Sequence, residues 1–192
     1  MEKPKILAFA GSTRTESYNK KLVKIAAQGA EAAGGDVTTI DLRDFPMPLF
    51  DQDFETKEGL PPAARALKRL MLSHQGFLIS APEYNSSITG VLKNAIDWTS
   101  RQETGESPLA CFEGKIAVLM SASPSGFGGM RGLVHLRAIL GNIGVLVLPG
   151  QIAVSKAHEA FDPSGALKDS KQDAAVKKLA ADLAKILTQL NP

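Results

Sequence analysis

The densest group of hydrogen-bonding and charged side chains near the N-terminus lies between Gly11 and Asn19. Arg14 is flanked in the sequence by four residues with hydroxyl groups, Ser12, Thr13, Thr15 and Ser17. A helical pattern follows, so the free N–H groups at its start would add donors and partial positive charge. Many short donors beside one guanidinium suit a terminal phosphate monoester. A hydroxyl-rich N-cap turn with an exposed Arg14 accounts for the same residues equally well.

The segment 11–19 does not match the two common nucleotide-binding loops. No second and third glycine follow Gly11 at the spacing of a dinucleotide fingerprint, so a pyrophosphate could not lie close to the backbone. A Walker loop is also excluded, because no Gly-Lys-Ser/Thr run follows. The segment therefore favours a phosphate monoester over a dinucleotide.

A second segment, 81–87, carries groups that could border a flat heteroaromatic ring. Pro82 fixes a turn, and the residues Glu83, Tyr84 and Asn85 then offer backbone N–H groups and one aromatic side chain. An edge of amide donors with an apolar flank suits such a ring. The alternative is an ordinary turn that caps the following helix and leaves Glu83 in solvent.

A third segment, 121–131, is rich in serine and glycine. Gly126 and Gly128 begin a partial dinucleotide fingerprint, but Arg131 occupies the place of its third glycine. No acidic residue lies about twenty positions downstream to hold a ribose, so we reject a dinucleotide site here. The glycines are expected to let the backbone approach a ligand closely.

Short apolar runs alternate with helical patterns along the whole chain. Five runs predict strands, at 6–10, 37–40, 77–80, 116–120 and 145–148. Periodic patterns predict helices from 19 to 33, around 64–71, over 88–98, around 133–140, and from Ser170, with Asp173 close to a capping box. The strands are apolar without alternation, as in parallel sheets covered on both faces. Residues 1–192 are therefore expected to form one α/β domain with a doubly wound five-stranded parallel sheet.

The predicted sheet brings the three polar segments together. They follow the first, third and fourth predicted strands, and the carboxyl ends of parallel strands share one edge. In such sheets a ligand binds beyond that edge, where the order of the strands reverses. We therefore expect one site built from all three segments.

Composition excludes several other functions. The net charge is +2 without a long Lys/Arg block, so no nucleic-acid partner is expected. Cys111 is the only cysteine and lies in an apolar connector, which predicts a buried thiol, no disulfide and a reducing cytoplasm. No segment is long and apolar enough to predict a membrane span. The three histidines form no catalytic set with serine and aspartate, and no metal site is expected.

Together the three segments resemble the NADPH-dependent FMN reductase family, which includes flavin-containing quinone, azo and chromate reductases. The matching motifs are Gly11-Ser12-x-Arg14-x-x-Ser17-x-Asn19; Pro82-Glu83-Tyr84-Asn85 running into Gly90-x-Leu92-Lys93-Asn94-Ala95-Ile96-Asp97-Trp98; and Ser123 through Gly128-Gly129 to Arg131. The similarity covers essentially the whole chain, and the second motif is highly specific.

The resemblance implies a flavodoxin-like fold and assigns residues to bound FMN. The phosphate would be held by Ser12, Arg14, Ser17, Tyr18 and Asn19. The isoalloxazine ring would be bordered by Pro82, Glu83, Tyr84 and Asn85 on one side and by Ser123 and Gly126 on the other. No catalytic side chain is required, because the flavin accepts the hydride at its N5 atom.

The resemblance also implies partners. NADPH or NADH would supply electrons, with Arg101 and Arg131 as candidates for the nucleotide, and a quinone, flavin, azo compound or chromate would accept them. Relatives bury the helix 90–98 in a homodimer or homotetramer, so Trp98 and Phe50 are expected as interface anchors. Lys93, Asn94 and Asp97 are then expected to be structural. Ser86 and Val134 stand where relatives sometimes carry aromatic residues, which leaves tetramer assembly and the acceptor open.

A flavodoxin-type electron carrier is the alternative from another functional class. Such carriers are usually acidic so that they dock on basic partners, whereas this chain is slightly basic. A receiver-like signalling domain of similar fold would need an acidic cluster after its first strand. The chain has Ala10-Gly11-Ser12 there instead. The sequence therefore favours an enzyme.

Overall fold

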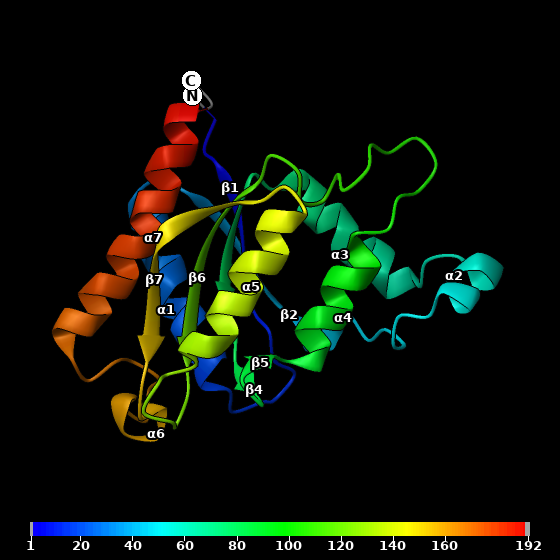
Figure 1. Cartoon of the computed structure of the whole chain (residues 1–192). Helices are drawn as coiled ribbons and strands as arrows, with labels where there is room; N and C mark the ends of the chain where they lie inside the picture. The colour runs from blue at the N-terminus through cyan, green and yellow to red at the C-terminus, as the bar shows by residue number, and fades with distance from the viewer. Residues whose placement is uncertain (1, 191–192) are drawn as a thin grey trace.

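A five-stranded parallel sheet forms the centre of the computed structural model, which describes residues 2–190 (Figure 1). Its strands lie in the order β2-β1-β3-β6-β7. Their bounds are β1 (Lys5–Ala10), β2 (Asp36–Asp41), β3 (Gly76–Ser80), β6 (Ile116–Ala122) and β7 (Leu146–Val154). This order reverses between β1 and β3, which is the flavodoxin-like arrangement.

Helices cover both faces of the sheet (Figure 1). α1 (Tyr18–Ala32) and α7 (Ser170–Leu190) pack on one face against Ile6 and Ala8 of β1. α3 (Pro62–Ser73), α4 (Gly90–Thr99) and α5 (Met130–Asn142) pack on the other face against Leu7 and Phe9. Because both faces are covered, the residues of β1 from Ile6 to Ala10 are all apolar and the strand shows no alternation. The predicted fold class is confirmed.

A short hairpin replaces part of the predicted helix 88–98. β4 (Glu83–Tyr84) pairs antiparallel with β5 (Ser87–Ile88), and α4 begins only at Gly90. The two turn residues between the strands, Asn85 and Ser86, have φ angles of 50° and 66°. Positive φ at both positions is the requirement of a type I′ turn. Two-residue strands are too short for a periodic signal, so the sequence did not predict the hairpin.

Other short elements also lay outside the prediction. They are the 3₁₀ turn η1 (Leu42–Asp44), α2 (Gln52–Glu58) and α6 (Ala157–Ala160). α2 has no buried residue, so no apolar face marked it in the sequence. Its start is fixed by the Asp51 carboxylate, which accepts hydrogen bonds from the N–H groups of Asp53 and Phe54.

The predicted end of one strand was wrong. The fifth strand, predicted as 145–148, continues through Pro149 and Gly150 to Val154, with a register shift against β6. An edge strand tolerates a proline and a bulge because one side needs no partner. α7 begins at Ser170, as predicted, and the capping side chain is Asp169, whose Oδ1 accepts from Lys171 N at 2.8 Å.

The single cysteine lies in the core, as predicted. Cys111 is 1% exposed, and burial raises the pKa of its thiol to about 11. The thiol therefore stays protonated and unreactive at neutral pH. Between residues 2 and 190, no helix combines the length and the apolar character that crossing a membrane would require.

Candidate functional site

The three polar segments meet at the carboxyl edge of the sheet, as the sequence predicted. The N–H of Gly11 donates to Ser80 O at 2.9 Å, and the N–H of Ala81 donates to Met120 O at 2.8 Å. The third segment continues the series on β7, where Ser123 N donates to Val154 O at 3.0 Å. The segments 11–17, 81–89 and 123–129 are called loop A, loop B and loop C below.

The buried Asn19 side chain ties this edge together. Its Nδ2 donates to Ala122 O at 2.8 Å, and its Oδ1 accepts from Ala122 N at 3.0 Å. Oδ1 also accepts from the Ser80 hydroxyl at 2.9 Å. These hydrogen bonds tie the start of α1 to β3 and β6. The assignment of Asn19 to the phosphate stays a prediction.

Loop A presents a helix start that no side chain satisfies. Ser17 occupies the N-cap of α1, but its hydroxyl makes no capping hydrogen bond, and the first turn carries no acidic residue. Ser12 and Ser17 are both about 5% exposed, and the Ser12 Oγ accepts from Arg14 N at 3.2 Å. Uncapped N–H groups with partial positive charge, beside two hydroxyls, form a receptor for an anion.

Arg14 and Tyr18 lie together at the outer side of loop A. The Arg14 guanidinium carbon is 5.7 Å from the centroid of the Tyr18 ring, and no carboxylate pairs with it in the described structure. Tyr18 in turn stacks on Phe161 at 5.9 Å. The stacked rings give the guanidinium a fixed support, so Arg14 is an unpaired cation beside the uncapped helix start.

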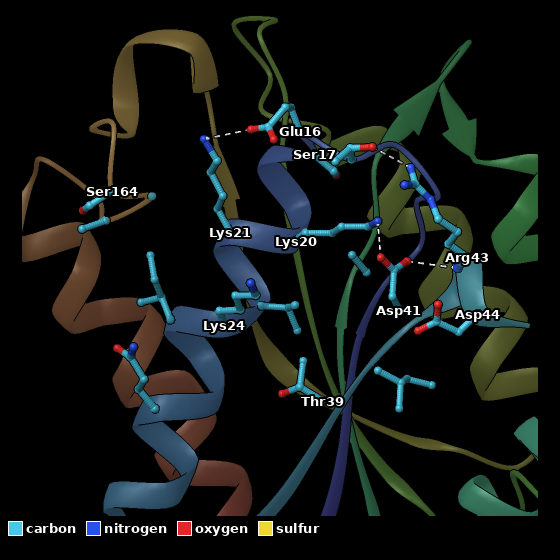
Figure 2. Close-up of a pocket in the computed structure, with 18 of the residues that line it drawn as sticks. Glu16, Ser17, Lys20, Lys21, Lys24, Thr39, Asp41, Arg43, Asp44 and Ser164 are labelled. Carbon is cyan, nitrogen blue, oxygen red and sulfur yellow. Dashed lines mark hydrogen bonds and ion pairs between the residues drawn. The ribbon is translucent and has the colours of Figure 1, made fainter.

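Arg43 braces loop A from the end of β2, which the sequence analysis missed (Figure 2). Its Nε donates to Thr13 O at 2.9 Å, and its Nη2 donates to the Thr15 hydroxyl at 2.9 Å. Arg43 follows the second strand, whose carboxyl end reaches the same edge. That position was the only signal, because no motif contains this residue.

The groove along α1 next to loop A does not extend the anion receptor (Figure 2). Its cations are largely compensated: Lys20 pairs with Asp41 at 2.5 Å, and Lys21 approaches Glu16 at 4.0 Å. Burial alone would raise the pKa of Asp41, but its hydrogen bonds from Lys20 and from the N–H of Arg43 hold that pKa below its usual value. The groove is thus close to charge balance.

Loop B is fastened to α5 by Glu83. The Glu83 side chain is 5% exposed, and its Oε1 lies 2.6 Å from the Arg131 Nη2. Its Oε2 accepts from Gly132 N at 3.2 Å. Burial alone would raise the pKa of Glu83, but Arg131 and the N–H groups at the start of α5 hold that pKa below its usual value. The hypothesis of a solvated Glu83 is therefore wrong.

The tip of loop B, residues 84–86, is open to solvent. Tyr84 is 57% exposed, and Asn85 supplies the positive φ of the hairpin turn. Pro82 is buried at the end of β3 and sets the direction of the hairpin. A second link joins the hairpin to α5, because His135 Nδ1 lies 2.9 Å from the Ser87 hydroxyl. Loop B is therefore linked to α5 through Glu83 and Ser87, while its tip faces solvent.

Loop C needs two of its glycines for packing against the protein itself. A Cβ on Gly129 would lie 2.0 Å from the Ser121 Oγ, and one on Gly128 would lie 2.8 Å from the backbone of β7. Both have positive φ, at 61° and 91° for Gly128 and Gly129. The predicted role in approaching a ligand does not explain these two. Gly126 faces open space, and its role at the flavin stays a prediction. The Ser123 hydroxyl accepts from Ser125 N at 3.2 Å, which closes the turn.

Arg101 lies apart from the three loops. It follows the C-terminal end of α4, and its Nε donates to the Glu55 carboxylate at 2.7 Å. α4 starts beside the hairpin and runs for 10 residues, so its two ends are about 15 Å apart. Of the two arginines predicted for the nucleotide, only Arg131 reaches the site.

Trp98 is not an exposed interface anchor, which corrects the expectation. The side chain is fully buried, and its Nε1 donates to Pro48 O at 2.8 Å. Asn94 holds the same loop, because its Nδ2 donates to Pro48 O at 2.9 Å. The structural role expected for the α4 motif is thus supported. The exposed apolar side chains of this region are Leu49, at 80%, and Phe54, at 38%.

The donor set fits FMN. A phosphate monoester matches the uncapped start of α1, the two serine hydroxyls and Arg14 of loop A. The β1/β3 switch point, where loops A and B adjoin, is the place where flavodoxin-like sheets bind FMN. Loops B and C lie at the same edge of the sheet as the uncapped start of α1, and they carry the exposed aromatic side chains Tyr84 and Phe127.

Comparison with known proteins agrees with this geometry. The family model for NADPH-dependent FMN reductases matches residues 4–159. An NAD(P)H-dependent FMN reductase of Pseudomonas aeruginosa is 37% identical over 168 residues, which cover 87% of this chain and 86% of that protein. A quinone reductase of Escherichia coli K12 is 35% identical over 147 residues, covering 77% and 74% of the two chains.

Solved structures share the fold. A flavoenzyme NAD(P)H:acceptor oxidoreductase from Paracoccus denitrificans has a TM-score of 0.80 at 24% identity, over 97% of this chain and 98% of its own. A flavodoxin from the domain Archaea has a TM-score of 0.63 at 13% identity, over 96% and 99%. Because an oxidoreductase and a flavodoxin share this fold, these likenesses establish the fold alone.

Proposed function

The chain belongs to the NADPH-dependent FMN reductase family, and from this premise we propose that it is an FMN-dependent oxidoreductase acting between NAD(P)H and small acceptors. The observation that carries the proposal is the uncapped start of α1 beside Ser12, Arg14 and Ser17. This receptor lies at the switch point of the sheet, next to the hairpin of loop B.

Bound FMN would supply the redox chemistry, since its ring takes up the hydride at N5 and gives up two electrons. The side chains of loop A would hold its phosphate, and Arg43 and Asn19 would keep the loop in place. The Arg14 guanidinium and the helix start would offset the charge of the phosphate. Loop A would therefore bind the phosphate of FMN and orient the cofactor.

Loops B and C would border the flavin ring. Pro82, Glu83, Tyr84 and Asn85 would lie along one edge, chiefly through backbone groups, and Ser123 and Gly126 would lie along the other. The overall reaction with a quinone consumes one NAD(P)H and one proton and yields NAD(P)⁺ and the hydroquinone. No acid, base or nucleophile of the protein is needed for the hydride step. Arg131 is the remaining arginine candidate for contact with the nucleotide.

We propose that the chain works as a homodimer or homotetramer. Leu49 and Phe54 expose apolar surface beside α4, the helix that relatives bury between subunits. Light scattering of the flavin-bound protein should show at least a dimer at micromolar concentration. A flavin-bound monomer would contradict this part of the proposal. We place the protein in the cytoplasm, where reducing conditions keep a lone thiol reduced.

We propose a quinone, free flavin, azo compound or chromate as the acceptor. The central test separates an enzyme from an electron carrier. Purified protein is loaded with FMN and mixed anaerobically with NADPH, and separately with NADH, while flavin absorbance is followed. If the protein is an enzyme, its flavin absorbance falls rapidly with at least one nucleotide and recovers when a quinone is added. Steady-state rates then follow ping-pong kinetics, because donor and acceptor alternate at one face. Flavin that binds but is not bleached by either nucleotide supports the carrier and contradicts the proposal.

A further inference from the structure

Loop C holds one large aromatic side chain out into solvent. Phe127 is 63% exposed, although the backbone around it is fixed. Gly128 N donates to Ser125 O at 3.3 Å, and Met130 N donates to Phe127 O at 3.1 Å. Gly128 and Gly129 are seated against β7 and Ser121 with no room for a Cβ. The ring is therefore presented from a rigid base.

Arg131 supports this ring from one side. Its guanidinium carbon lies 5.3 Å from the centroid of the Phe127 ring. The guanidinium is itself held by the buried Glu83 carboxylate, with Nε at 2.8 Å and Nη2 at 2.6 Å from Oε1. Glu83 is anchored in turn by Gly132 N at 3.2 Å. Two contacts, Glu83 to Arg131 and Arg131 to Phe127, thus link loop B through α5 to the exposed ring of loop C.

We propose that Phe127 is the residue that selects planar aromatic acceptors, and that Glu83 and Arg131 are its positioning pair. This inference rests on the proposed function, because it needs a flavin between loops B and C. A fixed ring offers stacking area with little loss of side-chain entropy on binding. The guanidinium contact keeps one face of the ring occupied, so the ring has one face free for a ligand.

The charges of the pair point to the same class of acceptor. Arg131 could attract a compact oxyanion such as chromate, but Glu83 already neutralises it. Loop C therefore offers an aromatic surface with little net charge. A planar quinone gains from such a surface, whereas a compact anion gains neither stacking nor charge attraction.

The test compares two acceptors in Phe127→Ala. The ratio of kcat/KM for a planar naphthoquinone to kcat/KM for ferricyanide, per bound flavin, should fall about 3- to 10-fold, as expected for loss of one ring contact. The control is Leu146→Ala, which removes another exposed apolar side chain at the start of β7, and its ratio should not change. An unchanged ratio in Phe127→Ala overturns the proposal.

A double-mutant cycle tests the positioning pair. Glu83→Gln keeps an acceptor for Gly132 N but removes the charge that holds Arg131, so the selectivity ratio should fall by at least twofold. The double variant Phe127→Ala/Glu83→Gln should have the same selectivity ratio as Phe127→Ala alone. A further fall there shows that Glu83 acts independently of the ring and overturns the pair's role. If NAD(P)H never bleaches the flavin of the wild-type protein, the proposed function itself is contradicted. If the flavin is bleached but Phe127→Ala does not change the selectivity ratio, only this inference is contradicted.

Discussion

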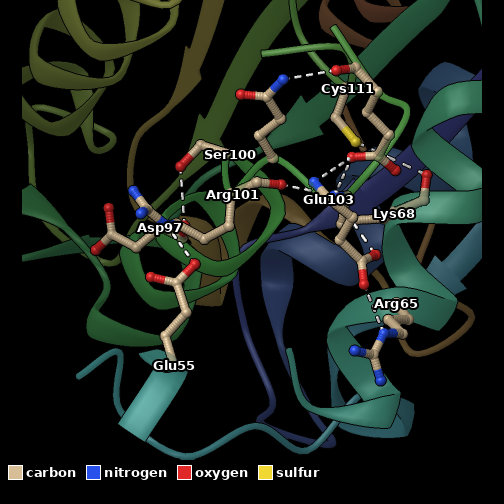
Figure 3. A network of polar contacts seen from close by, with 10 residues as sticks. Glu55, Arg65, Lys68, Asp97, Ser100, Arg101, Glu103 and Cys111 are labelled. Carbon is tan, nitrogen blue, oxygen red and sulfur yellow. Dashed lines mark hydrogen bonds and ion pairs between the residues drawn. The ribbon is translucent and has the colours of Figure 1, made fainter. Parts of the chain in front are cut away.

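Two polar regions of the molecule use the same residue types in opposite ways. The first, the α3–α4 network, consists of Arg65, Lys68, Arg101, Glu103 and Glu106 (Figure 3). The second is the group of loops A, B and C at the carboxyl edge of the sheet. Both contain arginines, carboxylates and backbone donors, so composition alone does not distinguish them.

Within the α3–α4 network the charges compensate one another. Lys68 is 2% exposed, and its Nζ lies 2.5 Å from the Glu106 Oε2 and 2.6 Å from Arg101 O. Arg65 pairs with Glu103 at 2.7 Å. The hydrogen bond from Lys68 outweighs burial and holds the pKa of Glu106 below its usual value. A buried charge that is fully paired fixes the chain but has nothing left to offer a ligand.

The three loops leave groups that are exposed or that have no capping or ion-pair partner among the described residues. Arg14 has only ring contacts, Ser17 does not cap α1, and Tyr84 and Phe127 are more than half exposed. Where pairing does occur there, through Glu83 or Arg43, it holds a loop in position. Unpaired groups on a braced frame are available to a ligand, whereas the groups of a closed network are already used by the protein itself.

The largest expected effect comes from a substitution that breaks the α3–α4 network. Lys68→Met should destabilise the protein by about 3 kcal/mol, because the Glu106 carboxylate and Arg101 O lose the buried ammonium group that donates to them. FMN affinity of the folded protein should stay the same. Urea unfolding and flavin titration measure the two quantities. As a control, Lys178→Met breaks a pair in which the lysine is 75% exposed and should change stability by about 0.5 kcal/mol or less. Equal losses in both variants would contradict the distinction.

The next effect appears at the open region. Arg14→Ala should weaken FMN binding by about 1.5–3 kcal/mol, since a charged hydrogen bond to the phosphate is lost. Stability without flavin should change little, because Arg14 is exposed and unpaired. Fluorescence titration with FMN gives the affinity, and Arg69→Ala on the exposed side of α3 is the matched control. Unchanged FMN affinity, or tighter binding of FAD than of FMN, would show that loop A does not hold the phosphate.

A smaller effect concerns the carboxylate that braces loop B. The pKa of Glu83 is lowered in the folded protein, so its contribution is complete above the usual value of 4.5 and disappears as the pH falls through the folded pKa. Glu83→Gln should therefore cost about 1 kcal/mol at pH 7, a modest value because Arg131 is half exposed. The difference between variant and wild type should shrink towards zero in strong acid. Urea unfolding at several pH values measures it, and a difference that persists in strong acid would rule out the charged pair as its cause.

The sequence predicted the frame better than the details of the site. Five apolar runs were enough for the sheet, and the polar segments after the first, third and fourth runs located the site. The roles of Asn19, Glu83 and Arg43 could not be predicted, because each depends on a partner between 28 and 103 positions away. The hairpin turn at Asn85 and Ser86 was missed because two-residue strands carry no periodicity. Burial of Trp98 depended on a loop whose path the sequence does not specify.

The smallest predicted effect tests an exception to the comparison. Ser121 Oγ is buried on β6 and has no hydrogen-bond partner among the described residues, whereas the buried Ser80 hydroxyl on the neighbouring β3 donates to Asn19. An unpaired buried hydroxyl costs free energy, so Ser121→Ala should stabilise the protein by about 0.5–1 kcal/mol, and Ser80→Ala should destabilise it by a similar amount. Because Gly129 covers Ser121, the flavin should not reach its hydroxyl, and FMN affinity should stay constant in Ser121→Ala. Urea unfolding of both variants and flavin titration of Ser121→Ala give the answer. If FMN affinity falls in Ser121→Ala, loop C opens on binding and the Ser121 hydroxyl contacts the flavin.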